Sequence, residues 1–416
     1  MVVYVLDIEG KPLMPTTRFG KVRRMLKNKE AKVVKREPFT IQLLYKSTTY
    51  TQPINLGVDA GSKTIGISAT TSDKELFCAE VKLRNDIVDL LATRRGARKN
   101  RRYRKTRYRK ARFDNRVSTK TNGWLAPSIH NKIDTHLTII DKITKILPIT
   151  TIIVEVASFD IQKIKNPNIQ SKEYQEGEQL SFWNIREYVL FRDNHTCQCC
   201  KGKSKDKILN VHHIESRKTG GNAPNNLITL CETCHTNYHK GKINLPKNIK
   251  RGMSFKDVTF MGIMRWAFYN KLKEIYTSVK MTFGYITKNI RINNNLPKEH
   301  YIDARCISGN PLAKSLGICY KYKKVRCHNR QLHKFVPNKK GIRLNNQAPY
   351  KVFGFRLNDK VLYKGQVCFI NGRRQSGYFS LRDINNNKIG NDNVSYKKLK
   401  FLEPTKSLLC QSIVNL

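Results

Sequence analysis

The sequence predicts a multidomain α/β protein whose mixed core is interrupted by a metal-binding insert and followed by a β-rich C-terminal region. Its 416 residues exceed the length of one ordinary domain. Short β-branched or alternating apolar runs alternate with helical patterns, which is typical of a mixed α/β core. Five of the eleven cysteines fall within residues 197–234, where they indicate a local metal site.

The charge balance points to the class of partner. The chain has 79 lysines and arginines against 31 aspartates and glutamates, a formal net charge of +48. Such an excess repels itself unless a polyanion neutralises it, so nucleic acid is the expected partner. A ribosomal-type or membrane-surface basic protein is the alternative. No run of 18 apolar residues occurs and the N-terminal strand carries an early acid, so we expect a cytoplasmic protein without a membrane span or signal peptide.

The first 85 residues contain two different patterns. Residues 1–52 predict a small basic unit of strand, helix and strand. Residues 53–85, with INLGVDAGSKTIGISATTSD, predict a β-hairpin that presents Asp59 on its first strand.

Residues 86–120 form a helical pattern crowded with basic side chains. Like charges one turn apart destabilise an isolated helix, so we expect phosphates to order it; the alternative is a solvated basic face or a disordered tail. Aromatic residues recur among the arginines and offer stacking contacts. The basic side chains predicted to bind nucleic acid in this segment are Arg94, Arg95, Arg98, Arg101, Arg102, Arg104, Arg107, Arg109 and Arg112.

The middle and end of the chain continue the mixed pattern. Residues 121–184 predict a helix followed by the buried strand TTIIVEVASFD, which carries Glu155. After the insert at 185–250, residues 251–320 contain a long amphipathic helix, a strand and a second helix. Residues 321–416 alternate strands with turn residues, which predicts a small antiparallel barrel or meander.

The cysteines of the insert have the spacing of two zinc knuckles. Cys197 and Cys200 form one CxxC pair, and Cys231 and Cys234 form the other. Together they predict one tetrahedral site of four thiolates, which has no open coordination position and therefore holds a structural zinc ion. Cys199 could replace a neighbour, but only Cys197 with Cys200 leaves the two-residue gap of a knuckle.

Four histidines lie around and between these cysteines. His212 and His213 occupy successive strand positions and therefore point to opposite sides. His235 and His239 share a face if the segment is helical. This geometry lets His212, His235 and His239 surround one metal ion and leaves His213 to take a proton from water. The alternative is that the histidines only cap a treble-clef zinc fold.

This order of residues resembles the HNH, or ββα-metal, nuclease motif. The offsets of HH, NN and H-x3-H are similar to those of nuclease colicins, with zinc knuckles added as in restriction-type HNH domains. The resemblance implies that His213 is the general base and that Asn226 fixes the loop that carries it. It also implies that His212, His235 and His239 are the candidate ligands of a divalent ion.

A second set of polar residues is dispersed along the chain. Asp59 and Glu155 lie in β-branched runs, and His300 and Asp303 are spaced i,i+3 on one predicted helix. An acid in such a run is costly to bury unless it meets a metal, although each alone could be a structural acid. Together they resemble the split RuvC motifs of an RNase H-like fold. The resemblance implies that Asp59, Glu155 and Asp303 hold Mg²⁺ or Mn²⁺ and that His300 assists proton transfer or positions the phosphate.

The order of these motifs resembles the IscB family, transposon-encoded RNA-guided nucleases related to the type II CRISPR effectors. The tetrapeptide PLMP at Pro12–Pro15 is the signature of that family's first domain. A relative without the HNH insert is excluded by the intact knuckles, and a large CRISPR effector by the length of the chain. The resemblance implies a PLMP domain at 1–52, RuvC-like parts at 53–85, 121–184 and 251–320, an arginine-rich bridge helix at 86–120, an HNH domain at 185–250 and a domain reading a target-adjacent motif at 321–416.

The resemblance also implies an activity. A structured guide RNA, called omega RNA in this family, would direct a monomeric protein to double-stranded DNA beside a short adjacent motif, and the complex would be nucleoid-associated when bound. The HNH site would cut the guide-paired strand and the RuvC-like site the displaced strand. Arg373 and Arg374 are possible readers of the adjacent motif. The alternatives are a nuclease-inactive accessory protein of transposition and an unguided HNH endonuclease.

Overall fold

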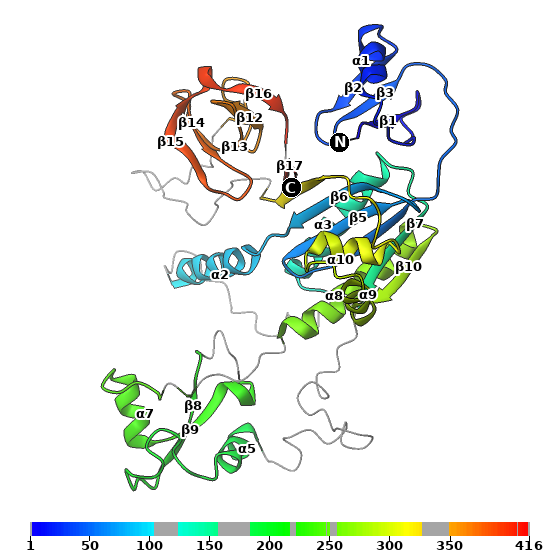
Figure 1. Cartoon of the computed structure of the whole chain (residues 1–416). Coiled ribbons are helices and arrows are strands. Elements are labelled where there is room, and N and C mark those ends of the chain that lie inside the picture. Colours follow the sequence, from blue (N-terminus) through cyan, green and yellow to red (C-terminus); the bar gives the residue numbers. More distant parts are fainter. Residues whose placement is uncertain are drawn as a thin grey trace. The chain divides into compact units, whose positions relative to one another are not determined.

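A computed structural model describes residues 2–103, 124–156, 184–216, 222–246, 248–249, 256–326, 349–405 and 407–414 of the chain (Figure 1). It divides into two compact units. The first combines Met1–Ala157 with Met261–Leu416, and the second is Ser158–Phe260. Among the described helices, none is long and apolar enough to cross a membrane.

The N-terminal part of the first unit is a three-stranded sheet with one helix. Its strand order is β1 (Tyr4–Leu6), β3 (Thr40–Leu43) and β2 (Ala31–Lys35), with β1 parallel and β2 antiparallel to β3. Helix α1 (Phe19–Lys27) buries Val22 and Met25 against the apolar side chains of these strands. The strand, helix and strand predicted from the sequence are therefore present.

The core of the first unit is a mixed seven-stranded sheet. Across the sheet the order is β10 (Val279–Phe283), β7 (Thr151–Val156), β4 (Asn55–Asp59), β5 (Thr64–Thr70), β6 (Glu75–Lys82), β11 (Ile318–Lys324) and β17 (Leu408–Val414). Strands β4, β5 and β6 form an antiparallel meander, whereas β7 runs parallel to both β4 and β10. Asp59 ends β4 and Glu155 lies near the end of the parallel strand β7, so both acids reach the same edge of the sheet.

Helices of the first unit position further side chains against this sheet. Helix α3 (Pro127–Thr144) begins with proline at its first position and buries an isoleucine face. Helix α2 (Ile87–Tyr103) is the described part of the arginine-rich segment. The remaining helices are α8 (Lys256–Ile275), α9 (Gly284–Asn293) and α10 (His300–Ile307).

Two glycines let α10 lie directly on the strands that it crosses (Figure 1). A Cβ atom on Gly57 of β4 would collide with the carbonyl oxygen of Ala304, and one on Gly66 of β5 with that of His300. Because α10 carries His300 and Asp303, this close approach brings both side chains to the end of β4.

The C-terminal part of the first unit is an all-antiparallel sheet. Its strand order is β15 (Lys388–Ser395), β14 (Tyr378–Arg382), β13 (Gln366–Arg373), β12 (Lys360–Tyr363) and β16 (Lys400–Glu403). Alternate residues of these strands, among them Val361, Ile370 and Phe379, form one apolar cluster. The predicted antiparallel pattern is thus present, in the form of a five-stranded sheet.

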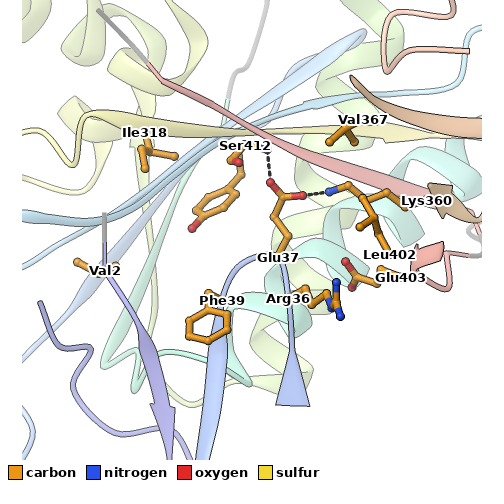
Figure 2. Close-up of a pocket in the computed structure, with 11 residues that line it drawn as sticks. Val2, Arg36, Glu37, Phe39, Ile318, Lys360, Val367, Leu402, Glu403 and Ser412 are labelled. Carbon is orange, nitrogen blue, oxygen red and sulfur yellow. Dashed lines mark hydrogen bonds and ion pairs between the residues drawn. The ribbon is translucent and has the colours of Figure 1, made fainter. Parts of the chain in front are cut away.

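A cavity of about 350 Å³ lies where side chains from all three sheets of the first unit meet (Figure 2). On its wall Glu37 accepts a hydrogen bond of 2.5 Å from the Ser412 amide and pairs with the ammonium of Lys360, whose side chain is only 6% exposed. Burial lowers the pKa of Lys360. A buried ion pair of this kind is costly to break on one side only, so it fixes the local contact.

The second unit is a hairpin followed by a helix. Strand β8 (Leu209–His213) pairs antiparallel with β9 (Leu227–Cys231), and α7 (Glu232–His239) begins at the end of β9. Helix α5 (Ile185–Arg192) precedes the hairpin, and a short 3₁₀ turn, η2 (Pro224–Asn226), leads into β9. The apolar core of this unit consists largely of the cysteines with Ile228 and Leu230.

Candidate active sites

Four cysteines converge at one end of the β8–β9 hairpin. One sulfur atom from each of Cys197, Cys200, Cys231 and Cys234 lies within 4.8 Å of all the others. Cys231 ends β9 and also caps α7, because its Sγ accepts the amide N–H of Cys234 at 3.5 Å. Cys199 is outside the group. Four thiols at these distances could bind a tetrahedral zinc ion.

Three histidines converge on the other side of the same hairpin. Ring nitrogens of His212, His235 and His239 all lie within 4.8 Å of one another, and the Nε2 atoms of His235 and His239 are 3.2 Å apart. His212 is buried, and its Nε2 has no hydrogen-bond partner among the described residues. Burial, with the neighbouring His235 and His239, lowers the pKa of His212 to about 4. A neutral imidazole with an orphaned nitrogen is the form that ligates a divalent ion.

His213 points away from this cluster, as the strand alternation predicts. Its Nε2 lies 3.0 Å from Oδ1 of Asn222. Because an amide oxygen only accepts, Nε2 carries the proton in this hydrogen bond and Nδ1 keeps its lone pair. His213 is therefore held in the tautomer of a proton acceptor by Asn222, a residue that no motif in the sequence singles out.

Asn226 closes the loop between the two strands. Its Oδ1 accepts the amide N–H of Glu215 at 2.9 Å, and its Nδ2 donates to the carbonyl of Glu215 at 3.0 Å. Its backbone carbonyl accepts from Ile214 at 2.9 Å. Asn226 is fully buried, so both hydrogen bonds are shielded from water. The loop that follows His213 is thus fixed at Glu215, which is the position predicted for this asparagine.

The dispersed acids of the first unit meet at one edge of the seven-stranded sheet. Asp59 accepts a hydrogen bond of 2.7 Å at Oδ2 from Nδ1 of His300. Glu155 pairs through Oε1 with Nη1 of Arg265 at 2.9 Å, and Asp303 pairs through Oδ1 with Nε of Arg291 at 2.9 Å. The sequence had singled out these three acids and His300, but neither arginine.

Electrostatics show that the acids share one environment. Burial raises the pKa of Glu155; Arg265 opposes the shift, and the carboxylates of Asp59 and Asp303 add to it. Burial is the main cause that raises the pKa of Asp303. The charge of Asp59 raises it further, whereas the charge of Arg291 lowers it. The hydrogen bond to Asp59 raises the pKa of His300.

Mutual repulsion between buried or partly buried carboxylates is what a divalent cation relieves. Among the described residues, however, Asp59, Glu155 and Asp303 do not form a group whose ligand atoms all lie within 4.8 Å of one another. In this arrangement Arg265 and Arg291 neutralise part of the charge of Glu155 and Asp303.

The predicted nucleic-acid-binding arginines divide into three groups. Arg94, Arg95 and Arg98 lie exposed along α2. Arg101 and Arg102 belong to the last turn of that helix. The other members of this set lie outside the described residues: Arg104, Arg107, Arg109 and Arg112.

Arg373, the last residue of β13, and Arg374, in the turn after it, have different surroundings. The guanidinium of Arg373 donates to the carbonyls of Tyr350 at 2.7 Å and Phe355 at 2.9 Å, and burial lowers its pKa. Arg373 therefore serves to hold the preceding loop. Arg374 is exposed and hydrogen-bonds the side chain of Asn393.

Two family models match the chain. The RRXRR protein family matches residues 3–177, and the HNH endonuclease family matches residues 197–241. The first match takes in Asp59, Glu155 and the arginine-rich segment. The second takes in both CxxC pairs and the four histidines. The chain therefore contains a domain of the HNH endonuclease family, at residues 197–241.

Similar proteins are known for parts of the chain. A stretch of 55 residues, 13% of this chain, is 38% identical to anaredoxin of Nostoc sp. and covers 68% of that protein. Among solved structures, Streptococcus thermophilus Cas9 in complex with the AGGA PAM is 13% identical, with a TM-score of 0.31 over 44% of this chain and 26% of that one. The complex with the GGAA PAM is 14% identical, with a TM-score of 0.35 over 49% and 29%.

The chain spans less than a third of the length of those Cas9 chains. The assignment of the family rests on the order of the matched segments. An RRXRR segment that begins beside the PLMP tetrapeptide is followed by an HNH domain, and that domain lies in the chain between Glu155 and Asp303. The two matches and their order along the chain support an IscB-like nuclease.

Proposed function

We propose that this chain is an RNA-guided DNA endonuclease with two hydrolytic sites, one in the HNH unit and one at the edge of the seven-stranded sheet. The observation that carries the proposal is the convergence of Asp59, Glu155, His300 and Asp303 at one sheet edge, although the HNH domain interrupts the chain between them. Two separate sites suited to metal-assisted hydrolysis match the two strands of a DNA duplex.

The proposal includes a RuvC-like core of the RNase H type. It is supported by the strand order, in which the antiparallel meander β6–β5–β4 continues into the parallel strands β7 and β10. It is also supported by the position of the acids on β4, on β7 and on α10, which crosses β4 and β5. The sequence predicts the RuvC-like parts at 53–85, 121–184 and 251–320; to these the proposed core adds the rest of β11, up to Lys324, and β17.

In the HNH unit the protein supplies a base and a metal pocket. Nδ1 of His213 accepts the proton of the attacking water, because Asn222 holds Nε2 as the donor. Asn226 keeps the loop in place by its two hydrogen bonds to Glu215. His212, His235 and His239 would hold the divalent ion, and the four cysteines a structural zinc ion.

At the sheet edge Asp59, Glu155 and Asp303 would hold Mg²⁺ or Mn²⁺. Bound there, such ions activate water and stabilise the charge of the phosphate in an in-line displacement. His300 is oriented by its hydrogen bond to Asp59, and its second ring nitrogen remains to exchange a proton or contact the phosphate.

The basic surface supports a nucleic acid guide. The net charge of +48 is larger than two active sites need to bind the phosphates of their DNA substrate. The exposed arginines of α2 offer a row of further phosphate contacts. In our proposal an omega RNA supplies the scaffold and pairs with one DNA strand, which the HNH site cuts, while the RuvC-like site cuts the displaced strand. Arg374 is the better placed of the two predicted readers of a target-adjacent motif, because Arg373 is engaged with backbone carbonyls.

The test is to purify the protein with its co-expressed RNA, sequence that RNA and incubate the complex with a matching plasmid, with and without Mg²⁺. The wild type is expected to linearise the plasmid, His213→Ala to nick only the displaced strand and Asp59→Ala only the guide-paired strand. Binding without Mg²⁺-dependent cleavage would support an accessory protein instead. Cutting without RNA would support an unguided HNH endonuclease, and linear product from both single variants would overturn the site assignment.

A further inference from the structure

Two stacked aromatic rings flank Gly284, whose backbone contacts Glu155 at the sheet edge. Phe283 is the last residue of β10, and Tyr285 is in the first turn of α9. Their ring centroids are 6.1 Å apart and their planes differ by 14°, so the rings are stacked and offset. Tyr285 is 67% exposed, so this ring is not part of the core.

The residue between the two rings brings them to the carboxylate. A Cβ atom on Gly284 would lie 3.1 Å from Oε1 of Glu155, so the backbone of α9 begins in contact with that side chain. Arg291, two turns further along α9, pairs with Asp303. Residues 284 and 291 share a helical face, and Tyr285 stands next to that face. The exposed ring therefore projects from the same first turn of α9 that contacts Glu155.

The surroundings of Tyr285 favour a nucleic acid over a protein partner. Lys280 on β10 and Lys288 on α9 are exposed close by in sequence, and the chain as a whole carries a charge of +48. An apolar protein surface would have to bury these ammonium groups, whereas a phosphate backbone neutralises them. An unpaired base offers a flat π-face that a tyrosine ring can stack on, and a base within a duplex does not.

We propose that Tyr285, supported by Phe283, stacks on an unpaired base of the DNA strand that is cut at the Asp59–Glu155–Asp303 edge. This inference rests on the proposed function, because it concerns the substrate of that site. Stacking holds the nucleotide beside the carboxylates and limits the freedom of the adjoining phosphate. Tyr285 is thus a positioning residue that favours single-stranded DNA, and because every base has such a face it does not select sequence.

The test uses the intact ribonucleoprotein and the variants Tyr285→Ala and Tyr285→Phe. The phenylalanine keeps the stacking face and removes only the hydroxyl. Tyr50→Ala, which removes a 91% exposed ring from the segment between β3 and β4, is the matched control. The displaced strand carries single 2-aminopurine bases at successive positions around its cleavage site, since the fluorescence of this base is quenched on stacking.

We expect Tyr285→Ala to relieve the quenching at one or two positions and to slow cleavage of the displaced strand about 5- to 150-fold, the range of losing one base–aromatic stack. Tyr285→Phe and Tyr50→Ala should behave as the wild type, and guide-paired strand cleavage should be unchanged in all three. Unchanged quenching and unchanged cleavage in Tyr285→Ala would overturn the inference, as would a slow Tyr285→Phe, because the hydroxyl would then be the active group.

A parallel Asp59→Ala measurement separates this inference from the proposed function. If Asp59→Ala still cuts the displaced strand, the sheet edge is not the site and both fail. If Asp59→Ala stops that cleavage but Tyr285→Ala equals the wild type, only the stacking role fails.

Discussion

Arg265 and Glu155 form a buried ion pair at the sheet edge, with Nη1 2.9 Å from Oε1. The same guanidinium donates from Nε to the carbonyl oxygen of Ala60, directly after β4, at 2.9 Å. One side chain of α8 thus joins the ends of β4 and β7, which carry two of the three acids. No other described cation is seen to pair with Glu155.

Replacing Arg265 by glutamine should therefore damage both stability and the sheet-edge site. It leaves the buried Glu155 carboxylate without its counter-charge, a change that costs about 3–5 kcal/mol. We expect lower resistance to urea and a loss of displaced-strand cleavage, measured on strand-labelled DNA. Arg265→Lys retains the charge and should lose less. A fully active, fully stable Arg265→Gln variant would contradict the bridging role.

Gly57→Ala should displace α10 from the sheet. The added Cβ would meet the carbonyl of Ala304 and the amide of Ser308, which are backbone atoms and cannot turn aside. Overpacking of this kind costs about 1–3 kcal/mol or more, and here it also moves His300 and Asp303.

Unfolding in urea and displaced-strand cleavage measure the two effects of Gly57→Ala. The matched control is Gly96→Ala in α2, where a Cβ meets nothing within 4 Å. That variant should be neutral or up to about 1 kcal/mol more stable, because alanine favours the helix. Equal behaviour of the two variants would show that the contact with α10 is unimportant.

A matched pair of cysteine substitutions tests whether the four thiols bind zinc. Cys200→Ser removes one member of the four-thiol group, whereas Cys199→Ser removes a neighbour outside it. We expect Cys200→Ser to lose bound zinc, measured by elemental analysis, and with it guide-paired strand cleavage, because the small core of the HNH unit depends on these side chains.

Cys199→Ser should keep both zinc and cleavage. Cleavage of the displaced strand should survive in Cys200→Ser, since its site lies in the other unit. A chelator selective for zinc over magnesium, added to the wild type with Mg²⁺ in excess, should reproduce the Cys200→Ser result. Equal zinc content in the two variants would argue against the four-thiol site.

The burial of His136 predicts how the free energy of unfolding depends on pH. It is fully buried in α3 against Phe268, and burial lowers its pKa to about 4. The unfolded chain takes up a proton near pH 6.5 that the folded state does not accept until about pH 4. Between these values the unfolded state binds more protons, so stability falls as the pH is lowered, by up to about 3 kcal/mol.

Urea unfolding at pH 7 and pH 5 should show this loss in the wild type. His136→Asn cannot titrate and keeps a side-chain donor where Nδ1 now faces the carbonyl of Lys132 at 2.8 Å. We therefore expect a smaller difference between the two pH values in this variant. An identical pH dependence in both proteins would mean that His136 is not the group responsible.

The sequence alone determined the features that depend on local spacing. The gaps between the cysteines and between His235 and His239 place ligands on one hairpin and one helix turn, and strand alternation separates His212 from His213. The β-branched runs around Asp59 and Glu155 predicted buried strands that end in acids, which the structure contains. The order of the motifs determined the family. These features need no knowledge of how distant segments meet.

Only the tertiary structure decided which side chains surround those residues. Asp59 meets His300 across 241 residues of sequence, and Arg265 meets Ala60 across 205, so no local pattern could reveal either contact. Arg373 looked like any basic residue until its backbone partners were seen, and Tyr285 became distinct from the other tyrosines only through Gly284 against Glu155. The physical reason is that spacing fixes neighbours within one element, whereas sheet order and close helix packing bring together segments that the chain keeps apart.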